Sequence, residues 1–230
     1  MDLYGDYANL RMLSLTLKTA GYESRILTRS LEDELDLSDA DFIYIGSGKE
    51  SAAKRALAHL LSQKAAFIEA FQRGTPILLT GNAMELIGRQ IVSKDGTIYE
   101  GLGLAPFKTK EGNARLVSDE IVSWEGHQLV GFINKASQIT GVDRPLFRVD
   151  FGLGNSEGDR SEGWTENNLF ATHLIGPILV KNPAFLLKMA SLAAGGALLD
   201  PDQIINPLAA EAYRNSLTEL LKRAKSEGKG

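Results

Sequence analysis

The sequence predicts an α/β fold in three layers: a mostly parallel sheet flanked by helices, with antiparallel additions in the middle of the chain. Two short apolar runs, residues 42–45 and 77–80, each end at a glycine, as strands buried on both faces often do. A helical pattern lies between them, which favours parallel pairing. We expect the two runs to be neighbouring central strands whose carboxyl ends share one crevice. From residue 114 to residue 151, β-rich runs follow one another without helices, which indicates antiparallel strands.

The elements of the N-terminal half follow from spacing and from end signals. Leucines recur at helical spacing after Asn9, a candidate N-cap, and Gly21 stands where a C-terminal glycine is expected. A second, long amphipathic pattern stops at Gly74. These signals predict helices at residues 10–20, 53–71 and 83–88, and strands at residues 23–27, 42–45 and 77–80.

The C-terminal half begins with a predicted hairpin, whose tip carries the Asp95-Gly96 signature of a tight turn. Residues 152–163 are rich in glycine and charge and predict an exposed loop. A further strand is expected at residues 169–174, with helices at residues 182–194 and 207–224. We therefore expect one α/β domain over residues 1–195 and a C-terminal helical extension, residues 196–230, packed on or near it.

Composition excludes several classes of function. The 230 residues include no cysteine, so disulfides, thiolate–metal sites and cysteine nucleophiles are ruled out. His59, His127 and His173 show no metal-ligand spacing, and we expect neither a metal nor a cofactor. The net charge of −4 argues against a nucleic-acid partner. No apolar run indicates a membrane span and no signal peptide is recognisable, so the expected location is the cytoplasm.

Five motifs follow one another in an order typical of one protein family. They are Leu3-Tyr4-Gly5-Asp6-Tyr7-Ala8-Asn9, similar to L-Y-G-D-x-G-N; Ile45-Gly46-Ser47-Gly48-Lys49-Glu50, similar to I-G-G-G-x-D; Glu100-Gly101-Leu102-Gly103-Leu104, which matches E-G-L-G-L; Gly131-Phe132-Ile133-Asn134 and Gly152-Leu153-Gly154-Asn155, similar to G-F-E-N and G-F-G-N; and Gly176-Pro177 with Lys181-Asn182-Pro183, similar to G-P-x-x-x-K-N-P. Over residues 3–194 the chain thus resembles the class I glutamine amidotransferases of the cobyric acid synthase-like group, especially the amidotransferase subunits of lipid II isoglutaminyl synthases.

The resemblance implies a specific chemistry. In this family a cysteine on a strand-to-helix turn attacks the side-chain amide of glutamine, a histidine acts as its base, and N–H groups of a glycine turn stabilise the oxyanion. The family's C-G-G-Y-Q-L-L-G falls on residues 81–88, and its L-H-G-P falls on residues 174–177. The nucleophile position is therefore Gly81 and the base position is Ile175, while Ile133 replaces the glutamate of G-F-E-N. The resemblance predicts a scaffold that is kept and a reaction that is lost.

The pocket candidates are the residues around these positions: Gly46, Ser47, Gly48, Gly81, Asn82, Glu85 and His173. The glycine turn either presents N–H groups to a ligand carboxylate or oxyanion, or is simply a strand-to-helix turn. Glu85 is either a pocket-facing carboxylate or a helix-surface acid. His173 is either a replacement base or a packing histidine. Ser47 and Thr80 supply hydroxyl groups without a visible base partner.

The resemblance also implies a β-strand ahead of the segment that begins at Leu3, which is where this chain starts. The first strand of a doubly wound sheet is usually central. Two alternatives follow: the start of the chain is truncated, or the sheet closes up without that strand.

Three functions remain open on these observations. The leading hypothesis is a non-catalytic amidotransferase-like subunit, or regulator, of a Mur-ligase-like partner in bacterial cell-wall precursor amidation. The second is an active amidotransferase of the cobyric acid synthase-like type, in which another residue or a partner's residue replaces the missing pair. The third is a sensor that binds a glutamine or glutamate-like ligand in a vestigial pocket.

Overall fold

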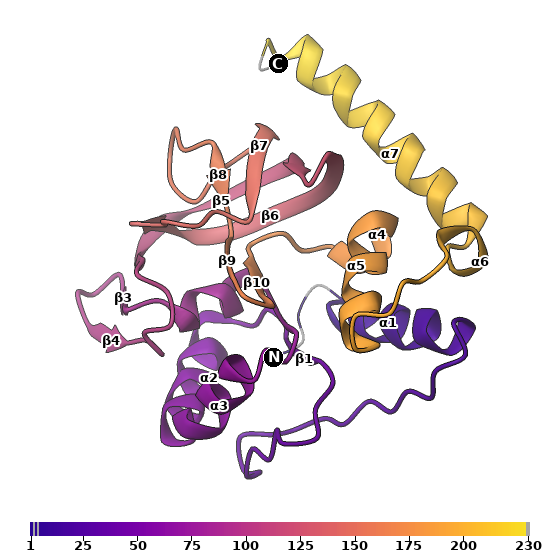
Figure 1. Cartoon of the computed structure of the whole chain (residues 1–230). Coiled ribbons are helices and arrows are strands. Elements are labelled where there is room, and N and C mark those ends of the chain that lie inside the picture. Colours follow the sequence, from indigo (N-terminus) through magenta and orange to yellow (C-terminus); the bar gives the residue numbers. More distant parts are fainter. Residues whose placement is uncertain (2, 4, 229–230) are drawn as a thin grey trace.

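The chain forms two β-sheets with helices packed around them (Figure 1). The structure, a computed structural model, describes residues 1, 3 and 5–228. The first sheet has the strand order β1-β2-β10-β9. Its strands are β1 (Ile43–Ile45), β2 (Ile77–Thr80), β10 (Leu169–Thr172) and β9 (Trp164–Glu166). The first three are parallel, so the predicted parallel neighbours are confirmed, although β1 lies at the edge of the sheet and is not central.

The middle of the chain forms a separate six-stranded sheet. Its strands are β3 (Gln90–Val92), β4 (Ile98–Glu100), β5 (Lys108–Trp124), β6 (His127–Thr140), β7 (Phe147–Phe151) and β8 (Ser161–Glu162). All of its pairings are antiparallel except that of β3 with β5. The predicted hairpin joins β3 to β4, and Gly96 at its tip has a φ of 85°. The predicted antiparallel strands in the middle of the chain thus form a second sheet, separate from the parallel one.

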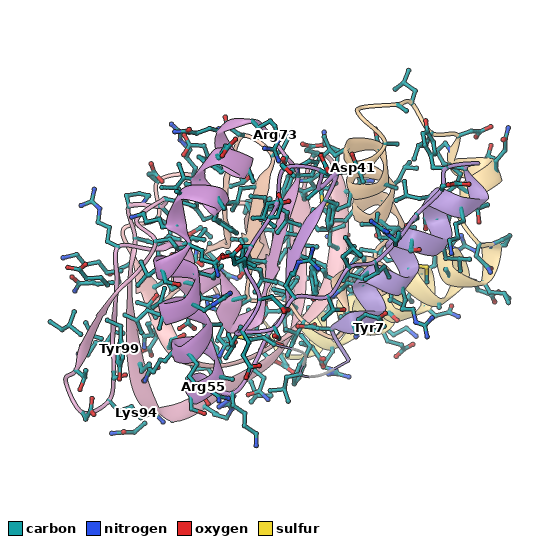
Figure 2. The ribbon with its side chains drawn as sticks, turned by 90° about the horizontal axis from the view of Figure 1, so that it is seen from below. Tyr7, Asp41, Arg55, Arg73, Lys94 and Tyr99 are labelled. Carbon is teal, nitrogen blue, oxygen red and sulfur yellow. The ribbon has the colours of Figure 1, made fainter. Side chains whose placement is uncertain are left out.

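Helices cover both faces of the first sheet. The helices of the described residues are α1 (Tyr7–Thr19), α2 (Glu50–Ser62), α3 (Lys64–Gln72), η1 (Gly81–Ile87, a 3₁₀ helix), α4 (Ile178–Lys181), α5 (Pro183–Ala193), α6 (Pro201–Ile204) and α7 (Pro207–Ser226). Figure 2 shows α1, which begins at Tyr7, on the opposite side of the sheet from α2 and α3. Side chains of β2 alternate accordingly: Ile77 and Leu79 pack in the core of α2 and α3, and Leu78 packs with α1 and α5.

Four local predictions are wrong, and the first three errors have a tertiary cause. Asn9 is not an N-cap; its buried amide donates to Tyr44 Oη (2.9 Å) and accepts from Leu179 N (2.8 Å). The helix predicted at residues 53–71 breaks at Gln63, whose side chain accepts a hydrogen bond from the backbone N–H of Leu35. Residues 152–163 are not simply an exposed loop, because their final residues form β8 and Asn155 is fully buried.

Residues 23–27 do not form the predicted strand. They run extended and join no sheet in the described part of the chain. A groove of about 1450 Å³ separates this segment from the free edge of β1, and its lining includes Leu13, Leu17, Leu60 and Phe67. A strand needs a neighbouring strand to pair its N–H and C=O groups. Residues 23–27 have the composition of a strand but lie beside no described strand that could pair with them.

Helix α7 lies against the outer face of β5 and β6 (Figure 1). Leu220 and Ala224 pack against Ile121 and Val130. The hydroxyl of Tyr213 donates to the carbonyl of Gln128 (2.5 Å). The division of the chain at residues 195 and 196 stays a prediction, and residues 2, 4, 229 and 230 lie outside the described residues. Among the described helices, none combines the length and apolar composition that crossing a bilayer requires.

Candidate functional site

The candidate site lies where β1 and β2 end side by side. β1 leads into the turn 46–48, and β2 leads through Thr80 into η1. Gly81, the first residue of η1, has a φ of 59°, in the left-handed region that disfavours residues with a Cβ. The carboxyl ends of two parallel strands therefore lie side by side, as predicted from the sequence.

The structure brings Gly81 and Ile175 together. A Cβ built on Gly81 would lie 3.2 Å from Ile175 Cγ2 and only 2.4 Å from Ser47 Cβ. Ile175 is 2% exposed and pairs with Phe132 in an isolated bridge. The two positions to which the resemblance assigns a nucleophile and a base are thus adjacent, and aliphatic carbon with the Ser47 side chain fills the space between them.

The N–H groups of the turn 46–48 already have partners within the chain. Ser47 N donates to Asp6 Oδ2 (2.6 Å). Gly48 N donates to Asn82 Oδ1 (2.9 Å), and Asn82 Nδ2 donates back to the Gly48 carbonyl (2.8 Å). A Cβ on Gly46 would lie 3.2 Å from Asp6 Oδ2, so the absent side chain makes room for that carboxylate. The turn therefore holds a carboxylate, and this carboxylate belongs to the protein.

The hydroxyls near the site also have an acceptor, contrary to the sequence interpretation. Ser47 Oγ donates to Asp6 Oδ2 (2.7 Å), and Thr80 Oγ1 donates to the same oxygen (3.0 Å). Asp6 is fully buried. The position of Asp6 within the motif from Leu3 to Asn9 is the sequence signal that points to this residue.

Glu85 and His173 belong to a different group of side chains, buried between the two sheets. Glu85 is 6% exposed and accepts from Ser137 Oγ (2.6 Å), so it is not a helix-surface acid. The His173 ring lies between two carboxylates: Nε2 is 3.5 Å from Glu85 Oε1, and Nδ1 is 3.5 Å from Glu162 Oε1. His173 is 2% exposed, and the two interpretations of this residue stay predictions.

Two further charged residues of this interior were missed by sequence reasoning. Burial raises the pKa of Glu120 to about 9, although the N–H of Leu153 lowers it, and Glu162 raises it as a like charge. Burial lowers the pKa of Lys135, against the carboxylates of Glu162, Glu85 and Glu120. Lys135 Nζ donates to the carbonyls of Gly154 (2.7 Å) and Asn155 (3.0 Å). The sequence signal was weak, because charged residues in long strands are usually taken to face solvent.

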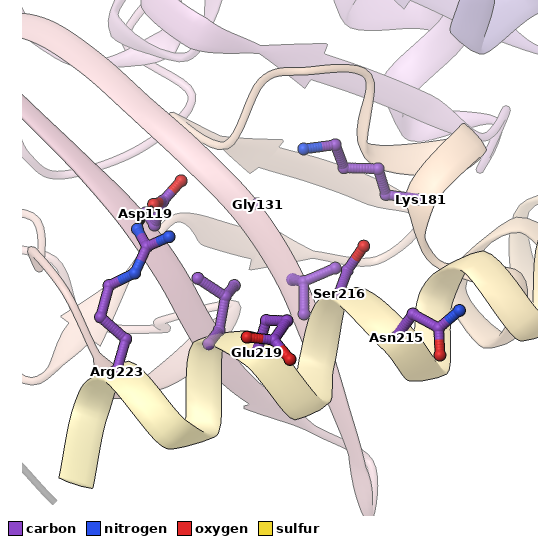
Figure 3. A pocket seen from close by; sticks show the side chains of 9 residues that line it. Asp119, Gly131, Lys181, Asn215, Ser216, Glu219 and Arg223 are labelled. Atoms are coloured by element: carbon purple, nitrogen blue, oxygen red, sulfur yellow. Dashed lines mark hydrogen bonds and ion pairs between the residues drawn. The ribbon is translucent and has the colours of Figure 1, made fainter. Parts of the chain in front are cut away.

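A second hollow, of about 400 Å³, lies between α7 and the β5–β6 ribbon. Figure 3 shows Lys181 on one side of it and Asn215, Ser216 and Glu219 of α7 on the other. Arg223 forms an ion pair with Asp119 at its end. Both signs of charge line this hollow, and none of the predicted site residues does.

Comparison with known proteins explains the shared motifs. Residues 1–183 match the model of the CobB/CobQ-like glutamine amidotransferase domain. The chain belongs to this family. It is 29% identical to the GatD subunit of lipid II isoglutaminyl synthase (glutamine-hydrolyzing) from Staphylococcus aureus, a match that covers 100% of this chain and 94% of that protein. It is 26% identical to the GatD subunit from Streptococcus pneumoniae, over 84% of this chain and 76% of that one.

Solved structures place the fold of this family member among class I glutamine amidotransferases. The glutaminase domain of Trypanosoma brucei CTPS, solved with acivicin, superposes with a TM-score of 0.56 at 12% identity, covering 84% of this chain and 89% of that one. A crystal structure of a glutamine amidotransferase gives a TM-score of 0.55 at 15% identity, covering 79% and 93%. The predicted family and the predicted fold class are both confirmed.

Proposed function

We propose that this chain is an amidotransferase-like subunit without glutaminase activity, which acts as a non-catalytic subunit or regulator of a Mur-ligase-like partner in cell-wall precursor amidation in the cytoplasm. The observation that carries the proposal is that Gly81 and Ile175 are adjacent, with a Cβ built on Gly81 3.2 Å from Ile175 Cγ2, and that neither residue offers a group for chemistry. Two relatives that are named subunits of lipid II isoglutaminyl synthase support the pathway.

The requirements of glutamine hydrolysis support the lack of activity. The reaction needs an attacking atom, a proton acceptor and oxyanion donors within about 3 Å of one carbon. Gly81 has no side chain, and Ile175 cannot accept a proton. The N–H of Ser47, a candidate oxyanion donor, is held by Asp6. In serine-protease sites without their triad, a residual acceleration of only about 10³–10⁴-fold over water remains.

An active amidotransferase is the second candidate, and one contact favours it. Ser47 Oγ donates to Asp6 Oδ2 at 2.7 Å, which gives this hydroxyl an acceptor near the family's nucleophile position. Against it, Ser47 is only 3% exposed, and a carboxylate is a much weaker base for a serine hydroxyl than the histidine that the family uses.

The test is an ammonia-release assay with glutamine, for the isolated chain and for the chain with the product of the neighbouring gene. We expect no turnover by the isolated chain between about pH 6 and pH 9, where a catalytic base would operate. We also expect the chain to change the rate at which the partner uses free ammonium. Ammonia release that disappears with Ser47→Ala would contradict the proposal and favour the second candidate.

A further inference from the structure

Asp6 stands at a helix N-cap but does not cap the helix. It precedes α1, where an aspartate side chain usually accepts from the N–H groups of the first turn. No such bond forms in α1. The Asp6 carboxylate instead turns away from its own helix, toward the ends of β1 and β2. Its position is therefore set by the sheet and not by helix capping.

The ends of these strands present three donors to one carboxylate oxygen. Ser47 N (2.6 Å), Ser47 Oγ (2.7 Å) and Thr80 Oγ1 (3.0 Å) all donate to Asp6 Oδ2. Thr80 Oγ1 also lies 2.7 Å from Tyr44 Oη, which in turn accepts from Asn9 Nδ2 (2.9 Å). When Tyr44 donates to Thr80, every proton in this relay points toward the carboxylate. Such chains of hydrogen bonds strengthen one another and favour an anion at their end.

The second oxygen of the same carboxylate is left without a partner. Asp6 Oδ1 is buried and makes no hydrogen bond to any residue that the structure describes. A buried carboxylate oxygen without a donor is unfavourable, and native side chains usually avoid it. The donors thus fit one oxygen of a carboxylate group closely, while Asp6 as a whole fits its surroundings poorly.

We infer that Ser47 and Thr80 form a binding site for the carboxylate of a small-molecule ligand, and that Asp6 is an internal substitute that keeps the site closed. Gly46 has no side chain, and a Cβ there would lie 3.1 Å from Asp6 Cβ, which leaves room for a carboxylate with a carbon substituent. An external carboxylate would take the place of the Asp6 carboxylate on the Ser47 and Thr80 donors. This inference does not depend on the proposed lack of turnover, because it concerns binding alone.

The test removes the internal carboxylate and offers an external one. In Asp6→Ala, formate and acetate should raise the melting temperature saturably, while chloride at equal ionic strength should not. At ten times the dissociation constant of the anion, the folding equilibrium constant should rise about tenfold. Asp6→Asn is the matched control: its amide keeps the volume of the side chain, so the anions should have no specific effect.

A second variant separates this site from general attraction of anions to the α1 N-terminus. Combining Asp6→Ala with Ser47→Ala should weaken formate binding about tenfold or more, since one hydrogen bond to a charged group is lost. Rescue by chloride equal to that by formate, or rescue unaffected by Ser47→Ala, would overturn the inference.

The unmodified chain provides a measurement that does not require the variant to fold. Formate competes with Asp6 for the Ser47 and Thr80 donors. Rising formate should therefore speed hydrogen exchange at the N–H groups of Tyr7, Ala8 and Asn9, while the N–H of Ser47 stays protected. Equal exchange at all formate concentrations, together with no rescue of Asp6→Ala, would show that Asp6 is an ordinary structural carboxylate.

Discussion

Gly81→Ala should destabilise the chain for two separable reasons. The left-handed φ of 59° disfavours any residue with a Cβ, at about 1–2 kcal/mol. The new Cβ would also lie 2.4 Å from Ser47 Cβ, far inside van der Waals contact, and overpacking of this kind costs about 1–3 kcal/mol. Together the two terms predict a loss of about 2–5 kcal/mol in the free energy of unfolding.

Ser47→Gly should remove the steric overlap between the new Cβ at position 81 and Ser47 Cβ. This change deletes the Cβ that the new methyl group meets, at the cost of the Ser47 Oγ bond to Asp6. In the Ser47→Gly background, Gly81→Ala should therefore cost the backbone strain and the small shift of Ile175, whose Cγ2 would lie 3.2 Å from the new Cβ. The double-mutant cycle should show a favourable coupling of about 1–3 kcal/mol. The motif I-G-G-G-x-D, which Ile45–Glu50 resembles, has glycine where this chain has Ser47, so the cycle tests whether the residues at positions 47 and 81 depend on each other.

The measurement is urea unfolding of the four proteins, followed by circular dichroism and extrapolated to water. Gly21→Ala is the matched control: Gly21 has a φ of 85° and nothing within 4 Å of its built Cβ, so it reports the backbone term alone. The reasoning is refuted if Gly81→Ala costs no more than Gly21→Ala. It is also refuted if the two changes at positions 47 and 81 add within about 0.5 kcal/mol.

Two further predictions concern the interior. Burial raises the pKa of Glu120 to about 9, so this carboxyl binds more protons in the folded chain than in the unfolded chain. The stability of the unmodified chain should therefore fall between about pH 5 and pH 9, by up to about 1.4 kcal/mol per pH unit, and Glu120→Gln should become increasingly stabilising over this range. Thermal melts of both proteins across this range test the prediction, and parallel curves would contradict it. Asn182→Ala should cost about 2–4 kcal/mol in denaturant unfolding, because it removes the hydrogen bonds that the buried Asn182 side chain makes with the backbone N–H and carbonyl of Val130. The exposed cap change Asn206→Ala should cost about 1 kcal/mol, and equal costs for the two variants would refute this prediction.

Sequence reasoning predicted the elements whose patterns are local. The runs that became β1 and β2 are apolar throughout, since helices cover both faces of their sheet, and this pattern is visible without a structure. The strand expected at residues 23–27 failed because a strand is defined by its neighbour, which composition does not reveal.

The candidate site was predicted only in part, for a similar reason. The positions of Gly81 and Ile175 came from motif order, and the structure places them in contact. Asp6 was missed because its partners, Ser47 and Thr80, are 41 and 74 residues away along the chain. Burial of Glu120 and Lys135 was missed because their strands bury positions that a charged side chain ordinarily avoids.

The geometry of the site implies that restoring two residues would not restore the reaction. In Gly81→Cys with Ile175→His, the new Cβ at position 81 still meets Ser47 Cβ at 2.4 Å, and Asp6 still holds the N–H of Ser47. We expect this pair to be less stable than the unmodified chain and to release no ammonia from glutamine. Adding Ser47→Gly removes the steric conflict with Ser47 Cβ, so the triple variant should regain stability. Its new cysteine should react with a thiol-alkylating reagent, and mass spectrometry would detect the added mass. Glutaminase turnover by the pair without the change at Ser47 would contradict the argument, because it would show that the side chain of Ser47 does not exclude a nucleophile from position 81.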